Sequence, residues 1–182
     1  MKNKDLNKLA KEVHENAVKN GFWDNNPSTE HCLMMVITEL SEAVEADRKG
    51  KMANLKWLEE TEQEDEFLNF EDYFTACIKD TVEDELADAY IRLLDVAGKE
   101  EIPLKRFDEH SNISPKTKPF TDNIYRIIVC FASPRFSLHG KVRSSMRQIE
   151  VLAESLNIDL LHHVELKMKY NQLREYKHGK RY

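Results

Sequence analysis

At 182 residues the chain is long enough for a buried hydrophobic core, and we expect residues 1–182 to form a single domain. Charged residues make up 33% and hydrophobic residues 41%, with only five Gly and five Pro, which favours helices over a turn-rich all-β protein. A formal net charge of −6 would repel the phosphate backbone of a nucleic-acid polymer. A small anionic ligand could still bind through a bridging cation.

Two amphipathic helices are predicted in the first 50 residues. Over residues 4–20, apolar or small side chains recur at helical spacing until GFWDNNP breaks the pattern. Ser28 is expected to cap a second helix that ends near Gly50, because its hydroxyl can accept from the free N–H groups of the first turn. The apolar stripe of this second helix comprises Leu33, Val36, Ile37, Leu40 and Val44.

The middle of the chain carries an acidic arm followed by a third strong helix. We expect a solvated helix or excursion over about residues 52–79, because its centre, LEETEQEDEFLNFED, has few apolar side chains to pack. Asp80 and Glu83 have the spacing of a capping box for a helix that ends at Gly98. Three upstream residues could extend that helix: Tyr73, Phe74 and Ile78.

The last third of the chain is again helical. A Pro-containing linker is predicted at about residues 111–120, followed by helices over residues 121–132, 137–156 and 159–177. These patterns together predict an all-α helical bundle with an acidic arm.

The cysteines and the hydropathy indicate a cytoplasmic protein. Cys32, Cys77 and Cys130 are far apart in apolar helical contexts, so we expect reduced core thiols. No apolar run follows the N-terminal lysines, and no stretch approaches the length needed to cross a bilayer. We therefore expect no membrane partner.

Two pairs of carboxylates recur at the same helical spacing. Glu39 and Glu42 are three residues apart on the second helix, and Glu85 and Asp88 repeat this spacing on the third. If the two helices face each other, their oxygen atoms form a cage for a hard ion such as Mg²⁺, whereas Zn²⁺ fits poorly. The alternative is an ordinary solvated helix face, because one side of the third helix carries Asp84, Asp88, Arg92 and Asp95.

A basic face is predicted on the last helix. Lys167, Asn171, Arg174 and His178 recur at helical spacing, and Lys, Arg and Asn together suit the oxygens of a polyphosphate. The alternative is a solvated basic helix end that complements the negative pole of the helix.

In their order along the chain, these motifs resemble the all-α nucleoside triphosphate pyrophosphohydrolases. This superfamily includes MazG-like proteins, dimeric dUTPases, dCTP pyrophosphatases and phosphoribosyl-ATP pyrophosphohydrolases. The resemblance rests on E-x-x-E, E-x-x-D and a closing K-x-x-x-N-x-x-R, supported by NGFWD before the second helix. It covers mainly residues 6–47, 80–98 and 159–182. The acidic arm lengthens the gap between the two carboxylate pairs beyond that of compact members.

The resemblance implies a four-helix core, a homodimer or homotetramer, and cleavage of a nucleoside triphosphate between its α and β phosphates. In this interpretation the four carboxylates bind Mg²⁺ and one of them helps to deprotonate the attacking water. The closing motif holds the substrate phosphates. The residues in question are Glu39, Glu42, Glu85 and Asp88 for metal and catalysis, and Lys167, Asn171 and Arg174 for substrate.

The expected role is nucleotide-pool housecleaning, and two other functions remain open. One is hydrolysis of phosphoribosyl-ATP. The other is a non-catalytic helical protein whose acidic arm binds basic partners.

Trp23 either stacks on a nucleobase or lies partly buried in the core. His162 and His163 are adjacent on a helix and point to different sides, so we assign them no metal role.

Overall fold

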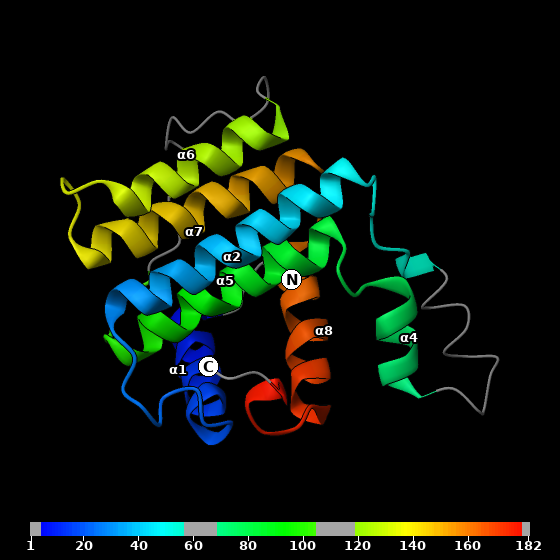
Figure 1. Ribbon diagram of the computed structural model, residues 1–182, viewed down its shortest axis with the longest axis horizontal. Helices are drawn as coiled ribbons and strands as arrows, with labels where there is room; N and C mark the ends of the chain where they lie inside the picture. Colours follow the sequence, from blue (N-terminus) through cyan, green and yellow to red (C-terminus); the bar gives the residue numbers. More distant parts are fainter. Residues whose placement is uncertain (1–4, 57–68, 105–118, 180–182) are drawn as a thin grey trace.

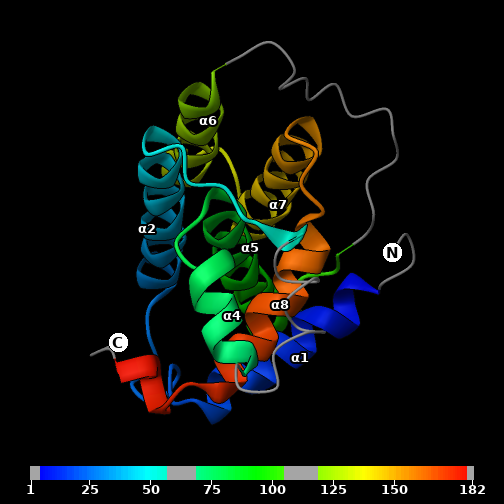
Figure 2. The same cartoon turned by 90° about the vertical axis from the view of Figure 1, so that its right-hand side faces the viewer.

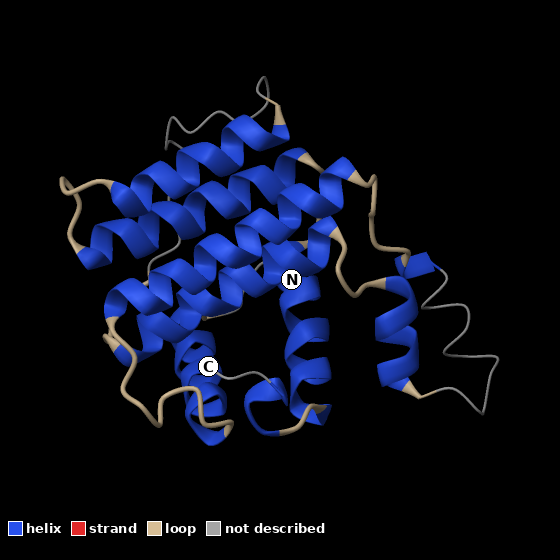
Figure 3. Cartoon of the chain, viewed as in Figure 1, coloured by secondary structure: helices blue, strands red, loops and turns tan. Residues whose placement is uncertain are grey.

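The computed structural model describes residues 5–56, 69–104 and 119–179, and in these residues it is all-α (Figures 1 and 3). This confirms the predicted fold class. None of the described helices is long and apolar enough to span a membrane. The elements are α1 (Leu6–Lys19), α2 (Thr29–Arg48), α4 (Phe70–Cys77), α5 (Val82–Lys99), α6 (Phe120–Ala132), α7 (Leu138–Ser155), α8 (Leu160–Leu173) and the 3₁₀ helix η1 (Tyr176–Gly179).

Helix α5 forms the centre of the bundle. It packs against α1, α2, α7 and α8, whereas α6 packs on α2 and α7 (Figure 1). Leu86, Tyr90 and Leu93 of α5 are completely buried, as expected for an apolar stripe. Because neighbours surround α5 on several sides, the polar side chains Asp84 and Glu85 are buried as well.

Helix starts follow the predicted capping chemistry at Ser28 but not at Asp80. The Ser28 hydroxyl accepts a hydrogen bond from the backbone N–H of His31 at 3.1 Å, as predicted. The N-cap of α5 is Thr81, whose hydroxyl accepts from the N–H of Asp84. Asp80 has a φ of 59° and belongs to the turn before the helix, so the predicted Asp80 cap was wrong.

Helix α4 is a separate element that packs on α8 (Figure 2). It begins at a capping box formed by Asn69 and Asp72, and it cannot continue into α5 because of the turn at Asp80. The rings of Phe74 and Tyr170 stack at 4.3 Å with an interplanar angle of 10°. The prediction that the upstream apolar residues extend α5 was therefore wrong. These upstream residues instead form a second small core together with Tyr170 of α8. Its members are Tyr73, Phe74, Cys77, Ile78 and Tyr170.

Replacing Phe74 with Ala is expected to lower the free energy of unfolding by about 3–5 kcal/mol. The Phe74 side chain is completely buried, so its removal leaves a cavity between α4 and α8. Urea denaturation at pH 7 measures the change. Phe70→Ala on the same helix is the matched control, and we expect it to cost less than half as much because Phe70 is only half-buried. A cost below about 1 kcal/mol for Phe74→Ala would contradict this packing.

The C-terminal helix is shorter than predicted. Helix α8 ends at Leu173, and Arg174 has an extended backbone with a ψ of 152°. The segment η1 then turns back onto the loop after α1, where the N–H of Lys177 donates to the carbonyl of Asn20 at 3.1 Å and the Tyr176 hydroxyl donates to Asp24. The prediction of one continuous helix to residue 177 was wrong, because this docking favours a different backbone path.

The three cysteines are free thiols, and they differ in burial. Cys77 and Cys130 are buried free thiols, as predicted, while the free thiol of Cys32 is only half-buried. The central part of the acidic arm, residues 57–68, lies outside the described residues, as does most of the predicted linker, residues 111–118.

Candidate metal centre

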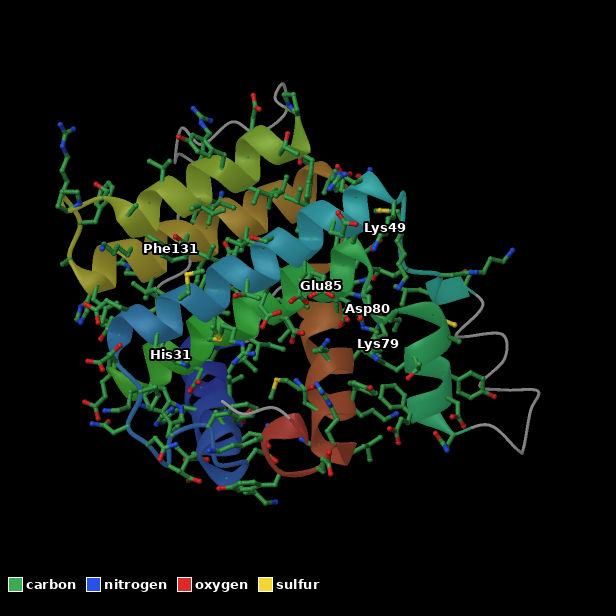
Figure 4. All side chains as sticks on the ribbon, in the orientation of Figure 1. His31, Lys49, Lys79, Asp80, Glu85 and Phe131 are labelled. Carbon is green, nitrogen blue, oxygen red and sulfur yellow. The ribbon has the colours of Figure 1, made fainter. Side chains whose placement is uncertain are left out.

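Three of the four predicted metal-binding carboxylates meet where α2 runs beside α5. Glu39 comes from α2, and Glu85 and Asp88 come from α5. One oxygen from each lies within 4.8 Å of the others. Figure 4 labels Glu85 on the part of α5 that runs alongside α2. The convergence follows from helix geometry, because residues three apart project from the same side of α5 towards its neighbour.

Glu42 lies at the edge of this carboxylate cluster rather than inside it. Its side chain is exposed, and its oxygens are not part of the three-residue group. It is still near enough for its charge to raise the pKa values of Glu39 and Glu85. The structure thus brings Glu39, Glu85 and Asp88 together and leaves Glu42 at the solvent-facing rim.

The cluster is costly to ionise fully. Burial raises the pKa of Glu85 to about 9, and the neighbouring charges of Asp88 and Asp84 add to this rise. Burial, followed by the charge of Asp88, also raises the pKa of Glu39. Without a nearby divalent cation, the folded protein is therefore expected to hold a proton on Glu85 at neutral pH. A bound cation would favour the ionised form instead.

Lys167 lies against the cluster and is not exposed to solvent. Its Nζ is 2.8 Å and 2.9 Å from the two oxygens of Asp84 and 2.7 Å from Oδ2 of Asp88. Burial alone would lower the pKa of Lys167, but the charges of Asp88 and Asp84 raise it overall. The alternative of a solvated helix face would expose Asp84, whereas its side chain is only 1% exposed. Its role as the buried partner of Lys167 was missed, because nothing in the local sequence links these two residues.

Arg92 holds the other side of the cluster. Its Nε and Nη2 donate to the same oxygen of Glu39, Oε1, at 3.0 Å and 2.9 Å. Its guanidinium carbon lies 5.8 Å from the centre of the Phe22 ring. The sequence showed Arg92 near the acidic residues of α5, but the contact with Glu39 comes only from the packing of α2 on α5.

A pocket opens beside the carboxylates. The residues that line it include Glu39, Asp88, Arg92, Asn171 and Arg174. The predicted substrate residues Asn171 and Arg174 therefore do reach one pocket, although Arg174 lies just beyond the end of α8. Lys167 is absent from the pocket lining, in contrast to its predicted role.

The aromatic residue that lines this pocket is Phe22 rather than Trp23. The indole N–H of Trp23 donates to both oxygens of Asp95 at 3.0 Å and 3.1 Å. Asp95 also contacts Nδ1 of His14 at 2.7 Å. These contacts anchor Trp23 to α1 and α5, which favours its core interpretation over base stacking.

The two adjacent histidines of α8 are not part of the cluster. Within the described residues, the group of possible metal ligands contains neither His162 nor His163. His163 is buried, and this burial lowers its pKa to about 4. A buried imidazole of this kind is neutral at physiological pH and fits a structural position.

The donor set of the cluster fits a hard divalent cation. Three carboxylates supply oxygen ligands only, and Mg²⁺ characteristically takes a few carboxylates and fills its remaining positions with water or phosphate. Two cations contact the outer side of these ligands. Lys167 bonds Oδ2 of Asp88, and Arg92 bonds Oε1 of Glu39. Such outer contacts orient metal-binding carboxylates.

The fold and the site together define an all-α bundle with a buried carboxylate cluster beside a pocket. Comparison of the chain with protein-family models, with curated proteins and with solved structures finds no match. The functional assignment therefore depends on the geometry of the site and on the motifs in the sequence.

Proposed function

We propose that this protein is a Mg²⁺-dependent nucleoside triphosphate pyrophosphohydrolase, which cleaves an NTP or dNTP to the monophosphate and pyrophosphate. The observation that carries the proposal is the convergence of Glu39, Glu85 and Asp88 from two helices to within 4.8 Å. A solvated helix face would leave these side chains exposed, but Glu39 and Glu85 are buried. The pocket beside them has cationic and amide side chains suited to phosphate.

Each part of the site has a role in this reaction. Glu39, Glu85 and Asp88 hold the cation, which supplies neutralising charge for the phosphate oxygens. Arg174 and Asn171, which line the same pocket, bind and orient the polyphosphate. A carboxylate of the site accepts the proton of the attacking water. The ion pairs of Lys167 with Asp84 and Asp88 hold these two carboxylates in place.

A homodimer or homotetramer remains a prediction, which size-exclusion chromatography with light scattering can test.

The direct test is pyrophosphate release from each common ribo- and deoxyribonucleoside triphosphate, with Mg²⁺ and with EDTA. We expect Mg²⁺-dependent release of pyrophosphate and a monophosphate from at least one of them. Asp88→Asn should lower this rate about 100-fold or more, because it weakens both the metal site and the contact with Lys167. The matched control is Asp122→Asn on α6, an exposed carboxylate outside the cluster.

Two results would count against the proposal. If no triphosphate releases pyrophosphate with Mg²⁺, the protein is not this enzyme. If Asp88→Asn and Asp122→Asn keep the same rate as the wild type, the reaction takes place elsewhere. Phosphoribosyl-ATP belongs in the same screen, since its hydrolysis is the alternative reaction of the same site.

A further inference from the structure

Arg92 is the cation that links the carboxylate cluster to the pocket. Its side chain is 28% exposed, whereas that of its partner Glu39 is only 6% exposed. The guanidinium thus reaches from a buried carboxylate to a surface that a ligand can touch. Arg92 also lines the neighbouring pocket, together with Phe22 and Asp95, so it lies where the two pockets adjoin.

Lys167, the cation expected from the sequence to bind phosphate, is placed differently. Its side chain is 6% exposed, and its ammonium contacts three carboxylate oxygens of Asp84 and Asp88. To reach a phosphate it would have to leave Asp84, which is almost completely buried. Breaking that contact would leave a buried charge without a partner, at high energetic cost. Arg92 faces no such obstacle.

The guanidinium of Arg92 has donors to spare. It carries five N–H groups, of which one on Nε and one on Nη2 are directed at Glu39. Its Nη1 makes no hydrogen bond to any of the described residues. A planar guanidinium can therefore keep its contact with Glu39 and still donate to an oxygen of a second anion.

We propose that Arg92 is a substrate-binding residue that bridges Glu39, a metal-binding carboxylate, to a phosphate of the substrate in the adjoining pocket. The inference rests on the proposed function and adds a residue to that site. Through this bridge, one guanidinium orients a carboxylate of the metal site and holds the phosphate beside it. Phosphate binding is thus coupled to the geometry of the metal site.

The test uses imidodiphosphate, a non-hydrolysable pyrophosphate analogue that needs no knowledge of the preferred base. Its affinity is measured by isothermal titration calorimetry at increasing Mg²⁺ for the wild type, Arg92→Gln and Arg92→Lys. We expect Arg92→Gln to bind at least about tenfold more weakly, and Arg92→Lys to fall between it and the wild type. The matched control is Arg48→Gln on α2, which removes an exposed ion pair with Glu45 and should leave the affinity unchanged.

The dependence on Mg²⁺ separates phosphate binding from a purely structural role. If Arg92 only oriented Glu39, saturating Mg²⁺ would restore the affinity of Arg92→Gln for imidodiphosphate, and this result would overturn the inference. Affinities of both Arg92 variants within about twofold of the wild type would also overturn it. Arg92→Lys keeps a cation beside Glu39, so it remains informative if Arg92→Gln does not fold.

Failure of this inference differs from failure of the proposed function. If the wild type releases pyrophosphate from triphosphates and binds imidodiphosphate, but the Arg92 variants bind equally well, only the role of Arg92 is wrong. If the wild type binds no imidodiphosphate with Mg²⁺ and releases no pyrophosphate, both proposals are wrong.

Discussion

Replacing Glu85 with Gln is expected to abolish Mg²⁺-dependent pyrophosphate release and, in EDTA, to raise the free energy of unfolding. Glu85 shares a 4.8 Å cluster with Glu39 and Asp88, so the substitution removes a metal ligand. It also removes a group that is costly to bury as an anion, since burial and the charge of Asp88 raise its pKa to about 9. Loss of activity together with a gain in stability is typical of a site arranged for ligand binding.

The pH dependence gives the sign of the stability change. In the unfolded chain the Glu85 carboxyl has its ordinary pKa of 4.5, while in the folded protein burial raises this pKa to about 9. Between these values the folded state binds a proton that the unfolded state has released. The free energy of unfolding should therefore fall as pH rises from 5 to 9, by at most about 1.4 kcal/mol per pH unit from this group. Glu85→Gln removes this decline, so its stabilising effect should grow with pH.

The measurements are urea denaturation in EDTA between pH 5 and pH 9, and pyrophosphate release with Mg²⁺. Glu83→Gln is the matched control, because Glu83 is a buried glutamate on the same helix that accepts the N–H of Ala53 at 2.9 Å. We expect Glu83→Gln to retain activity and to gain no stability. Full activity in Glu85→Gln, or a stability that falls with pH as in the wild type, would contradict the assignment of Glu85.

Replacing Lys167 with Met is expected to lower the free energy of unfolding by about 3–5 kcal/mol. The substitution leaves Asp84 and Asp88 close together without the ammonium that contacts both at 2.7–2.9 Å. Met has a similar length and fills the apolar space beside Phe74, so the lost charge is the main change. A lysine that only bound substrate from the surface would give almost no change in stability when replaced.

Chemical denaturation at pH 7.5 measures this cost. Lys169→Met, two residues along α8, is the matched control, because Lys169 is exposed with its Nζ 3.7 Å from the centre of the Phe70 ring. We expect the control to cost less than about 1 kcal/mol. Adding Asp84→Asn to Lys167→Met should recover part of the stability, since it removes one of the uncompensated charges. A cost below about 1 kcal/mol for Lys167→Met would show that its ion pairs are not important for the fold.

Local patterns in the sequence predicted most of the helices. The helix predicted over residues 121–132 is Phe120–Ala132, and that predicted over 137–156 is Leu138–Ser155. These helices are readable because the 3.6-residue period and the cap at Ser137 depend only on neighbouring residues. The boundary at Asp80 was less readable, because Asp80 and Thr81 are both suitable caps and the turn before α5 selects Thr81.

Local sequence patterns were enough to predict an all-α chain, two carboxylate pairs on separate helices and a closing motif of Lys, Asn and Arg. The packing of the helices was needed to show that three carboxylates meet, that Glu42 stays at the rim, and that Lys167 is buried in ion pairs with Asp84 and Asp88. The physical reason is the range of the interactions. Helix periodicity and capping act over a few residues, whereas the contacts of Lys167 with Asp84 and of Arg92 with Glu39 join positions 83 and 53 residues apart. Such pairs exist only once helices pack, because packing sets which side chains lose water and which charges become neighbours.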